Sequence, residues 1–151
     1  MKDYSKAEKY FERLNNVSYG NLFFEDFLGN KVSLYNYQGK LILINFWATW
    51  CETCKRETPK IIDLSNEYPD VQFIPLSYAS PTNSVIDYFS NKDYNMNTYI
   101  DYSGSIFSTF NISATPTIVI MDKNNKILFN GYTVSYTHLR AHETRHDLVC
   151  R

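Results

Sequence analysis

The feature that most constrains the fold is the stretch Leu41–Pro59, which reads LILINFWATWCETCKRETP. Its first part, Leu41–Trp47, is an apolar run interrupted only by Asn45. A short continuous apolar run predicts a strand that is buried on both faces, as in a parallel sheet. Cys51 and Cys54 follow where the chain leaves that strand and opens a helix. A Cys-x-x-Cys pair at such a strand-to-helix junction is a specific redox signal.

The two cysteines are spaced for thiol–disulfide exchange. Residues three apart on a helix are neighbours, so the two sulfurs can form a disulfide with little backbone movement. The first helical turn offers unpaired N–H groups and a positive dipole end, and both favour the thiolate of Cys51, the more N-terminal and more exposed cysteine. The alternative, a structural or metal-binding pair, would need a second pair, and the chain has only one other cysteine, Cys150.

The pattern FWATWCxxCKxExP resembles the active-site stretch of thioredoxin-like proteins of the TlpA/ResA type. The resemblance runs from Asn21 to Tyr132 and includes GNKVSL from Gly29, ATPT at Ala114–Thr117 and DKNNKI at Asp122–Ile127. It implies an α/β, thioredoxin-like fold with a central mixed β-sheet flanked by helices. It also implies a bacterial thiol–disulfide oxidoreductase that reduces protein disulfides, draws on an upstream thiol donor and serves, in its most specific form, cytochrome c maturation.

Proteins of this type work in the periplasm or cell envelope. Met1–Arg13 is charged and lacks the apolar segment of a signal peptide, so we expect either a processed or truncated chain or a cytosolic protein. The net charge of −1 indicates neither a nucleic-acid-binding nor a membrane-surface protein, and no apolar run is long enough to span a membrane. We expect a monomer without bound cofactor or metal.

Glu57 is the candidate acid/base residue. It lies three residues after Cys54 on the same helix face, and the matching glutamate of the ResA type lies beneath the cysteines and influences their protonation. Asn45 stands where many thioredoxins carry a buried aspartate that moves protons, and an amide cannot titrate. Glu52 is expected to face solvent, which leaves Glu57; the alternative is an ordinary exposed glutamate.

Three further residues are predicted to contact substrate. Thr115 and Pro116 resemble the cis-proline loop of the fold, and X–Pro is the one bond type that adopts cis at modest cost. In that arrangement the loop faces the cysteines, and the backbone of Thr115 can pair with an extended segment. The alternative is an ordinary trans turn. Trp50 is expected to border the active-site surface, whereas Trp47 is expected in the core.

The remaining patterns predict two strands within Leu22–Leu34, a helix over Glu52–Tyr68, a strand over Val71–Ser77, a helix over Pro81–Asn91, a short strand over Tyr99–Asp101, a short helix over Gly104–Phe110, and a hairpin of Thr117–Met121 and Ile127–Asn130. Pro59 lies inside the first helix and leaves the carbonyl of Lys55 without its helical N–H partner. Pro75 places its strand near an end or partly at an edge of the sheet.

We expect three parts: an N-terminal helical extension over 1–20, the thioredoxin-like domain over 21–134 and a poorly packed tail over 135–151. The tail holds all three histidines and resembles a translated adaptor sequence, so the usual C-terminal helix is expected to be missing or replaced. His142–His146 matches the HExxH zinc signature, but a terminal position without a third ligand argues against a zinc site.

Two other functions remain open at this point. A peroxide-reducing relative ranks low, because such proteins embed their cysteine differently and lack a CxxC at the helix start. A non-catalytic binding module that keeps the fold is the other alternative.

Overall fold

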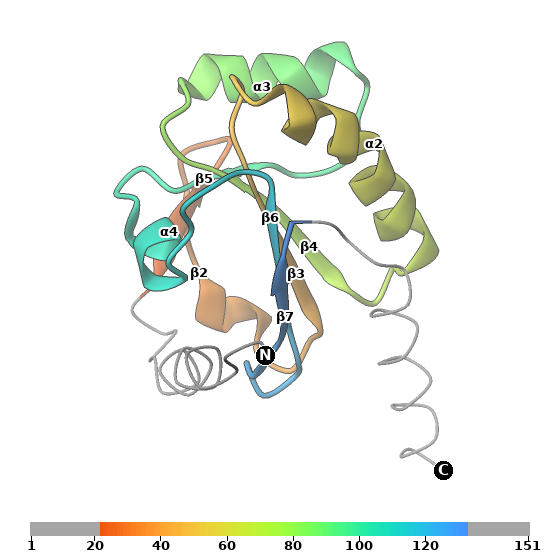
Figure 1. The fold of residues 1–151 in the computed structure, drawn as a ribbon, viewed down its shortest axis with the longest axis vertical. Coiled ribbons are helices and arrows are strands. Elements are labelled where there is room, and N and C mark those ends of the chain that lie inside the picture. Colours follow the sequence, from red (N-terminus) through yellow and green to blue (C-terminus); the bar gives the residue numbers. More distant parts are fainter. Residues whose placement is uncertain (1–21, 133–151) are drawn as a thin grey trace, which may run out of the picture.

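The computed structural model describes residues 22–132, which form one mixed sheet with helices on both faces (Figure 1). The described elements are β1 (Phe23–Asp26), β2 (Lys31–Ser33), η2 (Leu34–Tyr37), β3 (Ile42–Trp47), α2 (Glu52–Glu67), β4 (Gln72–Ser77), α3 (Thr82–Asn91), β5 (Tyr99–Ile100), α4 (Ser105–Thr109), β6 (Thr117–Met121) and β7 (Ile127–Gly131). The N-terminal extension, the tail and its HExxH segment lie outside the described residues.

The order of strands decides which loops meet. Within the described residues the sheet has the order β2-β1-β5-β4-β3-β6-β7. β3 runs parallel to β4, β4 runs parallel to β5, and β6 runs antiparallel to β3. Trp47 pairs with Ser77, and Ser77 pairs with Ile100, while Phe46 pairs with Thr117. The loops that follow β3, β4 and β5 and the loop that precedes β6 therefore share one edge of the sheet.

Strand β3 is buried along its whole length, as predicted. Its side chains alternate between two cores. Ile42, Ile44 and Phe46 belong to the cluster that includes the side chains of α4. Leu43 packs with α2, and Trp47 packs with Cys54 and with side chains of α3. A strand packed between helices on both faces has the continuous apolar sequence that the chain shows.

Helix α2 begins after Cys51 and buries one face. Its buried residues are Cys54, Thr58, Ile61 and Leu64, at the spacing of successive helical turns. The helix ends at Glu67 and is capped by Tyr68, whose backbone N–H donates to the carbonyl of Leu64. Across residues 22–132, α2 and its shorter neighbours all fall short of the length and apolarity that crossing a bilayer requires.

The predicted elements are found, with one addition. Both hairpins form, β1 with β2 and β6 with β7. Pro75 lies in the part of β4 that pairs with β3 but that β5 does not reach, which is a suitable place for a residue without an N–H. The addition is the 3-10 helix η2, where Ser33 caps the first turn by accepting from the N–H of Tyr35. A single turn of that kind leaves no periodic pattern in the sequence.

Candidate active site

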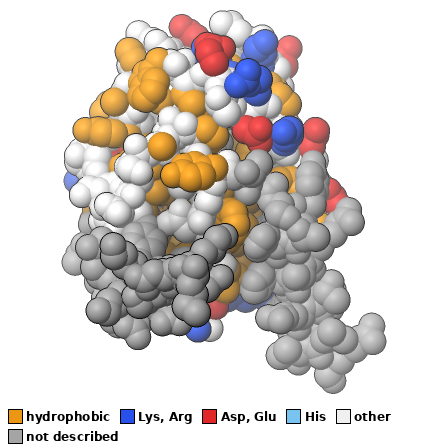
Figure 2. All heavy atoms as spheres, in the orientation of Figure 1, with side chains coloured by type: hydrophobic (Ala, Val, Ile, Leu, Met, Phe, Trp, Pro, Cys, Tyr) orange, Lys and Arg blue, Asp and Glu red, His pale blue; other side chains and the backbone are white. Residues whose placement is uncertain are grey.

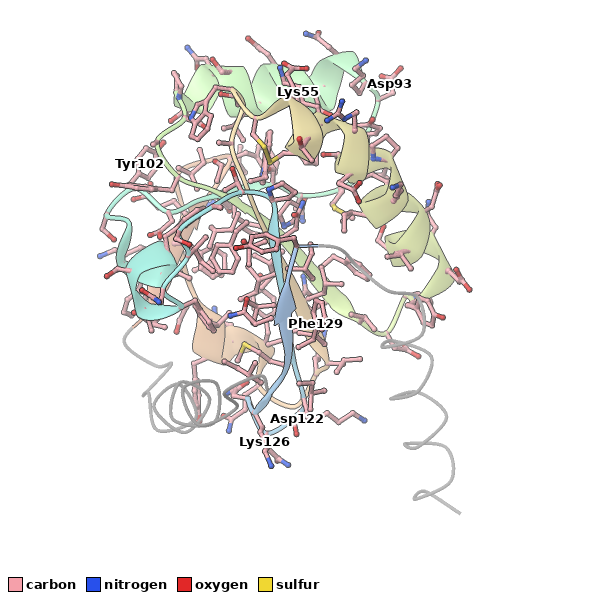
Figure 3. The ribbon with its side chains drawn as sticks, in the orientation of Figure 1. Lys55, Asp93, Tyr102, Asp122, Lys126 and Phe129 are labelled. Carbon is pink, nitrogen blue, oxygen red and sulfur yellow. A yellow bond between two sulfur atoms is a disulfide. The ribbon has the colours of Figure 1, made fainter. Side chains whose placement is uncertain are left out.

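The centre of the site is a disulfide between Cys51 and Cys54 in the first turn of α2, which Figure 3 shows just below Lys55. The two Cα atoms are 5.2 Å apart. Cys51 is 8% exposed and Cys54 is 1% exposed, so the N-terminal cysteine is the more accessible one, as predicted. Cys51 caps the helix, and its position places its sulfur at the positive end of the helix dipole.

Two backbone groups lie next to the sulfur of Cys51. The backbone N–H of Cys54 donates to it at 3.2 Å. An N–H directed at the sulfur stabilises the thiolate once the disulfide is reduced, and so lowers the energy of the nucleophilic form. The carbonyl oxygen of Thr115 lies 3.6 Å from the same sulfur, and in the protonated thiol form the S–H can donate to it.

The peptide bond between Thr115 and Pro116 is cis, as predicted. Pro116 is buried and Thr115 is half-buried. The hydroxyl of Thr117 donates to the carbonyl of Ala114 at 2.6 Å and ties the loop back on itself. Because β6 begins beside the end of β3, this loop reaches Cys51 across 64 residues of sequence.

Trp50 lies at the surface beside Cys51, with 67% of the residue exposed. Its ring N–H donates to the carbonyl of Ala79 at 3.2 Å, and the backbone N–H of Thr49 donates to the hydroxyl of Ser80 at 3.0 Å. These bonds join the loop after β3 to the loop after β4. Trp47 is 1% exposed and belongs to the core, as predicted.

Glu57 is partly buried, with 20% of its side chain exposed. Its carboxylate accepts a hydrogen bond from the ammonium group of Lys60 at 3.0 Å. The structure therefore places Glu57 one turn after Cys54 and pairs it along the helix, without a hydrogen bond to either sulfur. Glu52 faces solvent as expected, with 79% of its side chain exposed and a bond of 3.2 Å from Lys55.

Asn45 is 3% exposed and lies on the α2 side of the sheet, between Leu43 and Trp47 on the strand. The side-chain oxygen of Asn45, the ring N–H of Trp47 and the hydroxyl of Ser77 are buried without a hydrogen-bond partner among the described residues. Ser77 pairs with Trp47 across the sheet, so all three polar atoms belong to the same face. Buried groups of this kind are ordinarily satisfied by internal water.

Sequence reasoning missed Tyr88, which approaches α2 from α3. Its hydroxyl donates at 3.3 Å to the carbonyl of Lys55, the group that Pro59 leaves without a helical partner. Its ring lies 5.3 Å from the ring of Trp47. The proline did signal an orphaned carbonyl, but nothing in the local sequence indicated which residue would satisfy it.

Asp101 is a second residue that the sequence did not single out. It follows β5 and is fully buried. One carboxylate oxygen accepts from the backbone N–H groups of Ile106 and Phe107, both at 3.0 Å. Burial raises the pKa of Asp101, and these hydrogen bonds oppose that rise. Its carboxylate faces the start of α4, so the residue anchors the loop between β5 and α4.

The sequence of this chain is similar to those of known proteins. A family model described as thioredoxin-like matches residues 39–127. The chain is 29% identical over 125 residues to the thiol-disulfide oxidoreductase ResA of Bacillus cereus, with 79% of this chain and 72% of the relative covered. It is 34% identical over 118 residues to a thioredoxin-like protein of Haemophilus influenzae, with 78% and 70% covered.

Solved structures show the fold. A secreted disulfide oxidoreductase of Mycobacterium tuberculosis, homologous to DsbE of E. coli, superimposes with a TM-score of 0.68 at 21% identity. The match covers 86% of this chain and 93% of that one. The fold is therefore thioredoxin-like, as the sequence predicts. The family model spans more than half of the chain, and the chain belongs to the thioredoxin-like family.

Proposed function

We propose that this protein reduces disulfide bonds in other proteins, with Cys51 as the attacking thiolate and Cys54 as the resolving thiol. Its family and its Cys51–Cys54 pair make it a thioredoxin-like thiol–disulfide oxidoreductase. The similar protein of Bacillus cereus is named for the same activity. The order of attack, the reductive direction and the helper residues are the proposal.

The reaction runs in two exchanges. The Cys51 thiolate attacks one sulfur of the substrate disulfide, a new bond forms between Cys51 and that sulfur, and the other substrate sulfur leaves as a thiolate that takes up a proton. Cys54 then loses its proton and attacks Cys51, so the second substrate thiol is released. The substrate gains two electrons and two protons, and the enzyme is left as the Cys51–Cys54 disulfide. An upstream thiol donor restores the dithiol.

The observation that carries the proposal is the asymmetry of the two sulfurs. Cys51 caps α2, accepts the N–H of Cys54 at 3.2 Å and is the more exposed cysteine. Both cysteines belong to the buried cluster with Trp47, but Cys54 is 1% exposed and Cys51 is 8% exposed. A sulfur that is both stabilised as thiolate and accessible suits attack on a protein, whereas a buried sulfur one turn away suits intramolecular resolution.

Glu57 supplies the proton-accepting group in this proposal. Burial raises the pKa of a thiol, so resolution by Cys54 needs a nearby base. Asn45 cannot titrate, and the first histidine of the chain is His138. Asp101 is engaged with the start of α4. Glu57 is the remaining partly buried acid one helical turn from Cys54, and exchange of its proton with Cys54 through water is compatible with its ion pair to Lys60.

Trp50, Thr115 and Pro116 are proposed to contact the substrate chain. The carbonyl of Thr115 lies 3.6 Å from the attacking sulfur, where it can accept a backbone N–H of an extended segment. Trp50 directly precedes Cys51 in the chain, and 67% of the residue is exposed. Pro116, buried directly before β6, holds the loop at that position.

Covalent trapping tests the order of attack. Cys54→Ser should accumulate mixed disulfides with a disulfide-containing protein such as insulin, because the first exchange proceeds and the second cannot. Cys51→Ser should accumulate far fewer. Equal trapping by the two variants, or none by either, would sink the assignment of nucleophile and resolving cysteine.

The midpoint potential of the Cys51–Cys54 pair tests whether the protein reduces or oxidises its substrates. A reductase should titrate near the value of thioredoxin, about −270 mV, whereas a strong oxidant of the DsbA kind lies near −120 mV, about 150 mV higher. Reduction of insulin by the dithiol form separates a catalyst from a binding module that only keeps the fold. A potential near the oxidising end together with no insulin reduction would overturn the proposed function.

A further inference from the structure

Three exposed aromatic side chains stand on three successive loops at the edge of the sheet that carries the disulfide. Trp50 follows β3, Tyr78 follows β4 and Tyr102 follows β5, and they are 67%, 42% and 53% exposed. Figure 3 shows Tyr102 on its loop at the outer left of the molecule. Exposed aromatic residues gathered at one end of a fold are a feature of interaction surfaces.

Contacts between the loops hold these rings in place. The ring N–H of Trp50 donates to the carbonyl of Ala79, next to Tyr78. The ring of Tyr78 packs 5.4 Å from that of Phe107 and lies over Gly104, where an added Cβ would stand 2.9 Å from it. The hydroxyl of Tyr102 hydrogen-bonds to that of Thr82. The polar ends of Trp50 and Tyr102 are thus occupied within the protein, and their ring faces remain available.

The same surface carries no charged side chain at its exposed positions. The loops read Tyr-Ala-Ser-Pro-Thr over 78–82 and Tyr-Ser-Gly-Ser over 102–105, and the one acid beside them, Asp101, is fully buried. The charges near the disulfide lie on α2, where Glu52 pairs with Lys55. Figure 2 shows most of the charged side chains gathered at the upper right of the view, whereas hydrophobic and uncharged polar side chains dominate the upper left.

We propose that the surface formed by Trp50, Tyr78 and Tyr102, the aromatic loop surface, binds the substrate protein beside its reactive cysteine and selects an extended segment rich in aromatic and aliphatic residues without charges. The inference rests on the proposed function, because it names the substrate class for the same cysteines. The surface adjoins the reactive sulfur directly, since Trp50 precedes Cys51 in the chain.

The chemistry of the surface decides what it accepts. Contact between the ring faces and apolar or aromatic groups is favourable, because both surfaces are removed from water. A charged side chain laid on the same rings loses hydration and meets no opposite charge, because the loops supply none. An uncharged segment is therefore favoured over a charged one of equal length.

The test uses the full chain and two synthetic peptides of about nine residues, roughly 30 Å when extended. Each has one central cysteine in a disulfide with thionitrobenzoate, whose release is measured by absorbance. One peptide carries Tyr, Phe and Leu around the cysteine, and the other carries alternating Glu and Lys. The quantity compared is the ratio of kcat/KM for the uncharged peptide to that for the charged peptide.

We expect the parent protein to favour the uncharged peptide, and Tyr102→Ser to reduce the ratio by about fivefold, the effect of one aromatic contact. Tyr102→Phe, which keeps the ring, should retain the parent ratio. Tyr35→Ser is the matched control, because Tyr35 is 57% exposed but lies in η2, which follows β2 and is none of the three loops that carry the aromatic loop surface. It should also keep the parent ratio.

Equal use of the two peptides by the parent overturns the inference, and so does an unchanged ratio in Tyr102→Ser or an equal loss in Tyr35→Ser. A change of oligomeric state in Tyr102→Ser, measured by analytical ultracentrifugation, would make the surface an interface between copies and would likewise overturn it. Failure of the parent to reduce either peptide or free dithionitrobenzoate disproves the proposed function instead.

Discussion

The hydroxyl of Tyr88 donates a hydrogen bond of 3.3 Å to the carbonyl oxygen of Lys55. That carbonyl is the one for which Pro59, four residues later in α2, has no N–H to offer. A side chain from α3 thus satisfies the backbone of the helix that carries the cysteines, and it does so one residue after Cys54. The bond joins the active-site helix to its neighbour at the point where the proline interrupts the helical ladder.

Tyr88→Phe should lower the free energy of unfolding by about 1 kcal/mol, because the Lys55 carbonyl loses its partner while the ring stays. In a Pro59→Ala background, position 59 regains an N–H that can donate to the same carbonyl. The cost of Tyr88→Phe should then fall towards zero. Urea denaturation of the four proteins measures both costs, and strictly additive costs would show that Tyr88 does not compensate for the proline.

Glu57→Gln should shift the pH dependence of cysteine reactivity and slow resolution of the mixed disulfide, while the fold is kept. The side chain keeps its shape and loses its titration, so Cys54 loses its proton acceptor. The measurement is the alkylation rate of each reduced cysteine across pH. Glu52→Gln is the matched control on the same helix, since 79% of the Glu52 side chain is exposed.

The control should reproduce the parent profile for both cysteines. Superimposed profiles of the parent and Glu57→Gln would identify Glu57 as an ordinary helix residue paired with Lys60, and the proton-transfer part of the proposal would be wrong.

The raised pKa of Asp101 predicts that the free energy of unfolding depends on pH. Burial raises its pKa above the ordinary value of 3.8, so the folded state holds the proton more tightly than the unfolded chain does. Its contribution to stability is complete below pH 3.8 and declines as the pH rises through the raised pKa. Asp101→Asn keeps an acceptor oxygen for the N–H of Ile106 or Phe107 and removes the titration.

The free energy of unfolding of the parent minus that of Asp101→Asn should therefore fall as the pH rises above 3.8 and through the raised pKa of Asp101. Asp26→Asn provides a control of opposite sign. A hydrogen bond from the side chain of Asn30 is the main cause that lowers the pKa of Asp26, so its contribution is present above pH 3.8 and is lost as the pH falls. A flat difference for Asp101→Asn would contradict the prediction.

Gly104→Ala should destabilise the protein more than Gly29→Ala. Both glycines have positive φ, +71° and +84°, so either substitution costs about 1 kcal/mol in backbone strain. At Gly29 an added Cβ meets nothing within 4 Å, whereas at Gly104 it stands 2.9 Å from the ring of Tyr78. Thermal or urea unfolding measures the two costs. In a Tyr78→Ala background, the loss of stability caused by Gly104→Ala should fall to that caused by Gly29→Ala. If it does not fall, the ring of Tyr78 is not the cause of the larger loss at Gly104.

The local elements were predictable because each rests on neighbouring residues. The apolar run before Cys51 predicts the buried strand β3, and the Cys51–Cys54 spacing predicts a pair that opens a helix. The Thr115–Pro116 dipeptide before the apolar run of β6 indicated the cis bond that the structure contains. In each case a short-range pattern, a period or a special residue carries the information.

Contacts between loops were not predictable in the same way. The carbonyl of Thr115 near Cys51, the bond from Trp50 to Ala79 and the meeting of Tyr78 with Gly104 depend on which strands are neighbours and in which register. Tyr78 and Tyr102 read as ordinary polar loop residues, since exposed aromatics have no periodicity. Their common surface exists because β3, β4 and β5 run parallel and end together.

The sequence by itself determined the chemistry of this protein: a dithiol at a helix start, with the more exposed sulfur first, in a thioredoxin-like chain. Those properties follow from residue types at fixed short spacings. Only the tertiary structure decided what surrounds the dithiol, namely which carbonyl lies beside Cys51, which hydroxyl completes α2 and which rings border the disulfide. These are pairings between residues tens of positions apart, and the order and register of the strands select them.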